Sequence, residues 1–245
     1  MNGIAIILAI VVILLFYILY RFFMLKSTEL SSTASLLDSN PSIPIVNKPT
    51  STRYSYGIWI YVNSWDSSIE KTIFERKNNI KLYFSATAPV LKCDITMNNG
   101  STTASSTTLE ITDNFPLQKW VHIVTSVDNQ YLDAYLDGKL VKSGRLYTES
   151  VKAVAATSTV TAVTAVAEST PKTPGDEPIV IGSGTTYDAY IAKFNHWALP
   201  LDPQTVWSTY SEGNGQSGMN NYISSYGIDL SILKDNVEQS KYSLL

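Results

Sequence analysis

Residues 120–139, WVHIVTSVDNQYLDAYLDGK, contain the pattern that decides the fold class. Two runs in which apolar and polar residues alternate flank the pair Asp128-Asn129, and a period of two is typical of half-buried β-strands. Asp137-Gly138 follows the second run and is typical of a type I′ turn, in which both central residues have positive φ. The stretch therefore predicts two antiparallel strands followed by a second hairpin tip.

The period of two continues on both sides of this stretch. Over residues 53–62 one parity is apolar or aromatic throughout: Tyr54, Tyr56, Ile58, Ile60 and Val62. Further strands are predicted at 80–84, 90–95, 109–111, 179–181 and 189–197, with Asn, Asp and Gly between or at the ends of the early ones. Many short strands separated by turns predict an all-β fold, an antiparallel two-sheet sandwich.

One short helix is predicted near residues 200–210. Asp202 is suited to cap its N-terminus, Pro203 fits its first turn, and Gly213 can end it.

The N-terminal residues 1–26 are predicted to form a transmembrane anchor. No charged side chain occurs from residue 4 to residue 20, and about 20 apolar residues in a helix span a bilayer. Tyr17 and Tyr20 are placed for an aromatic belt at the membrane interface, where Arg21 and Lys26 can snorkel. A cleaved signal peptide is the alternative, but the first residues lack Lys and Arg, and no small-x-small cleavage motif follows the apolar run.

The flanking charges predict the orientation of this anchor. Arg21 and Lys26 follow the apolar run, so the positive-inside rule places the C-terminal domain on the cytoplasmic side. Asn99-Gly100-Ser101 is a formal glycosylation sequon and would require the opposite orientation. Short sequons arise often by chance, so the flanking charges carry the prediction.

The rest of the chain divides by composition. Residues 27–52 are rich in Ser, Thr and Pro and are predicted to be an extended spacer. The sandwich is expected over 53–213, interrupted at 148–177 by a low-complexity insertion that is either a mobile loop or an extra hairpin. Residues 214–245 are predicted to be a C-terminal tail.

Several of these runs also carry a family resemblance. In order and spacing, the runs 56–62, 120–139, 179–182 and 189–194, and Leu199-Pro-Leu-Asp before the helix, resemble concanavalin A-like (laminin-G/pentraxin-like) jelly rolls. The resemblance implies two packed antiparallel sheets but no single activity, because the fold hosts lectins, adhesion modules, glycanases and structural proteins. The layout of anchor, jelly roll and tail also resembles membrane-anchored minor structural proteins of large icosahedral DNA viruses.

The sequence argues against an enzyme. Glycanases of this fold carry several carboxylates along one strand, and no Glu-x-Asp-x-x-Glu run is present. Glu110 and Asp113 are three residues apart, which places them on opposite faces of a strand. His122 and His196 are predicted to be packing residues, and no His/Cys cluster has zinc spacing.

The remaining chemistry is sparse. Cys93 is the one cysteine and lies in a predicted strand, so we expect an inert, packed thiol. The formal net charge of −3 offers no basic field for nucleic acid.

Two kinds of weak binding candidate remain. Some relatives bind calcium at the rim of the sandwich, and Asp128, Asp133 and Asp137 could supply oxygens, although hairpin aspartates are usually turn formers and no cofactor is expected. Carbohydrate binding would need exposed aromatic side chains. The candidates for that role are Trp65, Trp197 and Trp207.

The sequence thus predicts a non-enzymatic, single-pass membrane protein whose jelly roll binds other proteins. Under the virion resemblance it links an internal membrane to the capsid, with its domain on the cytoplasmic leaflet facing the shell. The alternative is a membrane-anchored carbohydrate-binding (lectin-like) or adhesion protein.

Overall fold

Strand β2 (Arg53–Val62) lies in the middle of a sheet and shows why the sandwich forms. The side chains of Tyr54, Tyr56, Ile58, Ile60 and Val62 are at most 1% exposed and belong to the core between two sheets. The predicted period of two is therefore confirmed. The computed structural model describes residues 8, 10–17, 19, 27–44, 51–100, 105–152, 167–182, 184, 186–215, 229–234 and 237–243.

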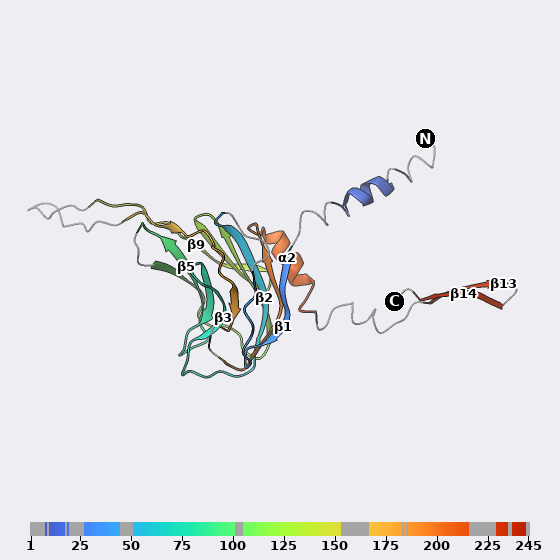
Figure 1. Cartoon of the computed structure of the whole chain (residues 1–245), viewed down its shortest axis with the longest axis horizontal. Coiled ribbons are helices and arrows are strands. Elements are labelled where there is room, and N and C mark those ends of the chain that lie inside the picture. Colours follow the sequence, from blue (N-terminus) through green and yellow to red (C-terminus); the bar gives the residue numbers. More distant parts are fainter. Residues whose placement is uncertain are drawn as a thin grey trace, which may run out of the picture.

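The sheet that contains β2, here called sheet A, has six antiparallel strands (Figure 1). In spatial order these are β1 (Thr28–Ser35), β12 (Ala189–Trp197), β2, β7 (Trp120–Asp128), β8 (Tyr131–Leu136) and β9 (Lys139–Arg145). The hairpin predicted at Asp137-Gly138 joins β8 to β9, and both residues have positive φ, 47° and 77°.

The second sheet, sheet B, packs against the inner face of sheet A. Its order is β10 (Thr170–Pro171), β5 (Leu91–Asn98), β4 (Ile80–Phe84), β3 (Lys71–Arg76) and β11 (Ile179–Ile181), with β6 (Ser105–Thr112) also paired to β5. The layers meet through aromatic packing: the ring centroids of Tyr56, Phe74 and Phe194 lie 4.8–6.1 Å apart. The core also contains Cys93, fully buried as expected.

Helix α2 (Pro203–Ser211) lies on the outer face of sheet A, where Val206 packs against Val124 and Tyr135. Asp202 caps it: one carboxylate oxygen accepts the backbone N–H groups of Gln204 at 2.9 Å and Thr205 at 3.1 Å. The predicted helix and its cap are therefore confirmed.

Several segments differ from the prediction. Residues 28–35 belong to the predicted spacer, yet they form edge strand β1 because β12 offers them a free hydrogen-bonding edge. Strands β3 and β9 were not predicted either. In the C-terminal segment expected to be a tail, β13 (Asp229–Lys234) and β14 (Val237–Ser243) form a two-stranded sheet.

The two described ends of the insertion at 148–177 pair with each other beside the sandwich. Thr148 and Ser169 exchange two backbone hydrogen bonds of 3.0 Å, and β10 follows at once. These described ends are paired like those of a hairpin, whereas residues 153–166 lie outside the described residues.

The described N-terminal residues 8, 10–17 and 19 are helical. Among the residues that the structure describes, no helix is long and apolar enough to cross a membrane. Most of the segment predicted as an anchor, including Tyr20, Arg21 and Lys26, lies outside the described residues. Tyr17 is described and is 61% exposed.

Candidate functional site

The outer face of sheet A is covered over part of its area. The Ser55 hydroxyl donates to the carbonyl of Leu199 at 3.0 Å, and Trp197 packs so closely over Gly57 that a Cβ there would lie 2.9 Å from its ring. One outward position further along β2, Trp59 stacks under Tyr210 of α2, with centroids 5.6 Å apart. In the part of the chain that the structure describes, helix α2 and the segment before it therefore cover this face as far as Trp59.

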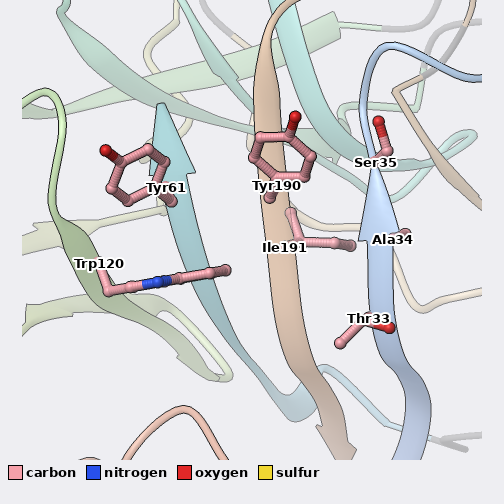
Figure 2. A pocket seen from close by; sticks show the side chains of 7 residues that line it. All are labelled: Thr33, Ala34, Ser35, Tyr61, Trp120, Tyr190 and Ile191. Atoms are coloured by element: carbon pink, nitrogen blue, oxygen red, sulfur yellow. The ribbon is translucent and has the colours of Figure 1, made fainter. Parts of the chain in front are cut away.

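Beyond Trp59 the face is open and carries three aromatic side chains in register. Tyr190 of β12 is paired with Tyr61 of β2, and Tyr61 is paired with Trp120 of β7. Figure 2 shows these side chains on three neighbouring strands, around a hollow that β1 borders on the other side. We call Tyr190, Tyr61 and Trp120 the aromatic row.

The hollow at the aromatic row has a volume of about 520 Å³, within the usual range for small-ligand sites. Tyr190 is 42% exposed, Tyr61 and Trp120 are half-buried, and the centroids of the last two lie 5.7 Å apart. Thr33 and Ser35 of β1 supply hydroxyl groups to the lining, and Ser35 is paired with Tyr190. The site therefore combines apolar ring surface with neutral hydrogen-bonding groups.

A polar group precedes β12, two residues before Tyr190 of the aromatic row. The Asp188 carboxylate accepts hydrogen bonds from the Asn63 side-chain amide at 2.6 Å and from the Ser64 hydroxyl at 3.2 Å. Asp188 lies two residues before Tyr190 and Asn63 two residues after Tyr61, and the backbone N–H of Asn63 donates to the Asp188 carbonyl at 2.9 Å. A carboxylate therefore lies near the aromatic row along the chain, just outside the residues that line the hollow.

Two of the three predicted sugar-binding tryptophans are packing residues. Trp197 is 5% exposed and fills the space above Gly57. Trp65 is half-buried against the ring of Phe84, and the Lys71 ammonium lies 4.3 Å from its ring centroid. Trp207 is 49% exposed, but it lies on α2 beside Gly138 and does not line the hollow.

The aspartates proposed for calcium do not converge. Asp128 pairs with Arg53 at 2.9 Å. The carboxylate of Asp137 accepts the backbone N–H of His122 and the Lys119 ammonium. No group of three or more His, Cys, Asp or Glu side chains that could hold a metal ion occurs among the described residues. Asp133 lies within β8, where its register partners are Ser126 and Ser143.

The other candidates for chemistry are occupied or buried. Glu110 pairs with Lys92 at 3.6 Å, and burial raises the pKa of the Cys93 thiol far above its usual range. Burial also lowers the pKa of both His122 and His196 to about 4, so both imidazoles are neutral at pH 7. The histidines are packing residues, as predicted: they are 3% and 4% exposed.

Sequence reasoning missed the aromatic row. Tyr61 could be assigned to the outward parity of its strand, because Ile60 and Val62 belong to the core. Nothing in the sequence states that Tyr190 and Trp120 are its neighbours, because that depends on strand order and register.

The two-sheet sandwich agrees with the result of the comparison with protein families. The family model of the concanavalin A-like lectin/glucanases superfamily matches residues 37–207, and the chain belongs to this superfamily. The match begins before β2, whereas the predicted sandwich began at residue 53. No protein among the curated sequences matches the chain.

Solved structures with a similar arrangement include binding domains of botulinum neurotoxins. The receptor binding domain of botulinum neurotoxin D is similar with a TM-score of 0.48 and 15% identity, over 76% of this chain and 47% of that chain. The binding domain of botulinum neurotoxin DC in complex with rat synaptotagmin II has a TM-score of 0.41 and 14% identity, over 67% of this chain and 36% of that chain. The present chain thus spans less than half of either structure.

Proposed function

We propose that this protein is a non-enzymatic, membrane-attached carbohydrate-binding domain. The observation that carries the proposal is the aromatic row, three aromatic side chains in register on the open part of sheet A. The C–H groups on one face of a sugar ring pack on the electron-rich face of an aromatic ring, while its hydroxyls need hydrogen-bonding partners nearby. The aromatic row offers the ring faces, and Asp188 offers a hydrogen-bonding partner. Membership of a superfamily that includes lectins supports this choice over a purely structural role.

The absence of enzymatic activity is part of the proposal. Glycoside hydrolysis uses two carboxyl groups that flank the scissile bond. Asp188 lies two residues before Tyr190, but among the described residues the lining of the hollow contains no acidic side chain to work with it. Glu110 lies on β6 in the other sheet and is paired with Lys92. We therefore expect binding without turnover.

Membrane attachment is supported by the N-terminal helical residues. Their described apolar side chains, from Leu8 to Leu19, are 41–69% exposed. Exposed apolar surface of this kind is stable where lipid or another apolar partner covers it.

The test is a binding measurement on the full-length protein in lipid nanodiscs, with an array of oligosaccharides followed by calorimetry on those that bind. Tyr190→Ala should weaken binding at least about tenfold, equivalent to about 1.4 kcal/mol. Tyr131→Ala is the matched control, because Tyr131 is an exposed tyrosine of sheet A that does not line the hollow. If the two variants bind equally well, the aromatic row is not the site. Release of sugar products from any bound oligosaccharide would contradict the absence of turnover.

Membrane orientation provides a second, independent test. Arg21 and Lys26 favour a cytoplasmic domain, whereas most glycans that a lectin could meet lie on the opposite side. Asn99 of the sequon lies in the β5–β6 connection and is half-buried. An endoglycosidase-sensitive mass shift that Asn99→Gln abolishes would support the carbohydrate-binding role. A domain without glycan and open to protease from the cytosol would contradict it.

A structural role in a virion, linking an internal membrane to a capsid, is the second candidate. The observation that favours it is strand pairing outside the sandwich: among the described strands, β13 and β14 pair only with each other. A segment outside the main fold is suited to engage a neighbouring protein. Cross-linking of β13–β14 to a capsid subunit in purified particles would support this role, and absence of the protein from particles would eliminate it.

A further inference from the structure

The aromatic row has a direction and a length that restrict its ligand. Ser35, Tyr190, Tyr61 and Trp120 are register partners on β1, β12, β2 and β7. Neighbouring strands are about 4.8 Å apart, so the aromatic row extends about 10 Å at right angles to the strands, and about 14 Å when Ser35 of β1 is included. A single sugar covers only part of that length, whereas a short extended oligosaccharide contacts all of it.

The charges around the aromatic row restrict the ligand further. Among the described residues, no charged side chain lines the hollow. Lys119 precedes Trp120 in the sequence, but its ammonium lies 3.3 Å from the Asp137 carboxylate. The acidic residue near the rings along the chain is Asp188, two residues before Tyr190. A carboxylate or sulfate group on a sugar would lose its hydration here without finding a cation to pair with. The negative charge of Asp188 would also repel it.

Asp188 retains capacity for a ligand hydroxyl. Its hydrogen bonds from Asn63 and Ser64 both go to Oδ2. Among the described residues, no hydrogen bond to its Oδ1 is found. An ionised carboxylate only accepts hydrogen bonds, and every hydroxyl of a neutral sugar can donate one.

We infer that the aromatic row binds an uncharged oligosaccharide that lies across β12, β2 and β7, with a hydroxyl group donating to Asp188. This inference rests on the proposed carbohydrate-binding function and adds the chemical class and minimum length of the ligand. The aromatic row provides the stacking surface. Ser35 provides a hydroxyl group at the β1 end. Asp188 provides the discrimination against acidic sugars.

The experiment compares neutral and acidic probes on the full-length protein in nanodiscs. The neutral probes are gluco-, chito-, malto- and galacto-oligosaccharides with their single sugars, and the acidic probes are sialylated, sulfated and uronic-acid oligosaccharides of matched length. A neutral oligosaccharide should bind at least about tenfold more tightly than its single sugar and its acidic counterpart. Asp188→Asn should weaken neutral binding and reduce the discrimination against the acidic probe.

The control is Asp133→Asn, which removes one charge from β8 of the same sheet, outside the hollow. Asp133→Asn should leave the affinities for the neutral and the acidic probe unchanged. Melting curves of Asp188→Asn and Asp133→Asn check that the fold is intact. Tighter binding of acidic probes, or equal binding of single sugars and oligosaccharides, would overturn the inference but leave the proposed function standing. If neither neutral nor acidic probes bind, the proposed function itself fails.

Discussion

Gly138 meets two separate requirements at the tip of the β8–β9 hairpin. Its φ is +77°, and a Cβ would lie 2.7 Å from the Trp207 ring and 3.1 Å from that of Tyr210. Tyr210 cannot easily retreat, because it stacks on Trp59. The glycine therefore permits both the turn and the contact between this hairpin and α2.

We expect Gly138→Ala to destabilise the protein more than the same change at Gly100. Both glycines have positive φ, which costs an alanine about 1–2 kcal/mol, but a Cβ on Gly100 would meet no atom within 4 Å. The additional crowding at Gly138 should lower the free energy of unfolding by about 1–3 kcal/mol more. Urea unfolding of the two variants measures the difference, and equal losses would show that α2 adapts without cost.

At the scale of the secondary-structure elements, α2 is held at its N-terminus by one side chain. The carboxylate of Asp202 accepts two backbone N–H groups and, at 2.7 Å, the hydroxyl of Thr205. The Thr205 hydroxyl and these backbone bonds hold the pKa of Asp202 below its usual range. Because Val206, at the end of this first turn, packs against Val124 and Tyr135, fraying of the turn would weaken the cover of sheet A.

Asp202→Ala should lower the free energy of unfolding by about 1 kcal/mol, as the loss of a helix cap commonly does. Asp202→Asn should retain most of the stability, since an amide oxygen can accept the same N–H groups. Chemical unfolding followed by tryptophan fluorescence measures both variants. If Asp202→Asn lowers the free energy of unfolding as much as Asp202→Ala, the negative charge and not the capping hydrogen bonds stabilises the helix.

The elements also show how far the sequence could predict this fold. Strand β2 was predictable because every second residue, from Tyr54 to Val62, is aliphatic or aromatic and belongs to the core, and α2 because Asp202 and Pro203 mark its start. Strand β1 was not predictable: its sequence TELSSTAS has one large apolar residue, Leu30, and its pairing comes from the neighbouring β12. Strand β9 is exposed at six of its seven positions, so no buried face marks it.

The candidate site was predicted less well than the fold, for a related reason. Trp65 and Trp197 were chosen as large aromatic residues, but their surroundings cover them. Tyr61, Tyr190 and Trp120 are far apart in the chain and become one surface only through the order β12–β2–β7. Composition and parity can predict that a side chain points outward, but not which strands lie next to it or whether a helix covers them.

At the scale of the whole molecule, His122 and His196 couple stability to pH. His122 lies against the rings of Trp59 and Tyr210, with the charges of Asp137 and Lys193 nearby. His196 lies against Tyr56, with its ring centroid 4.9 Å away, and faces the cation of Arg76. The Nδ1 atom of His122 and the Nε2 atom of His196 are buried and find no hydrogen-bond partner among the described residues. At both histidines the cost of burying a charged imidazole prevails, even though the Asp137 charge favours protonation of His122.

Acidification should therefore destabilise the folded state between pH 6.5 and about 4. Burial lowers the pKa of both histidines from 6.5 to about 4, so in this window the unfolded chain binds more protons than the folded chain. One pKa unit corresponds to about 1.4 kcal/mol, so each histidine contributes at most a few kcal/mol. This stability is fully present above pH 6.5 and is lost as the pH falls toward 4.

Urea midpoints measured at intervals from pH 7.5 to pH 4 test this, with His122→Gln and His196→Gln singly and together. The double variant should keep a nearly constant midpoint down to about pH 4.5, because glutamine does not titrate. Carboxylates with lowered pKa, such as Asp66 and Glu177, lose their contribution only below their usual values of 3.8 and 4.5, and so act mainly at the acidic end of the range. If the double variant loses stability between pH 6.5 and 4.5 as steeply as the wild type, groups other than these two histidines control the acid response.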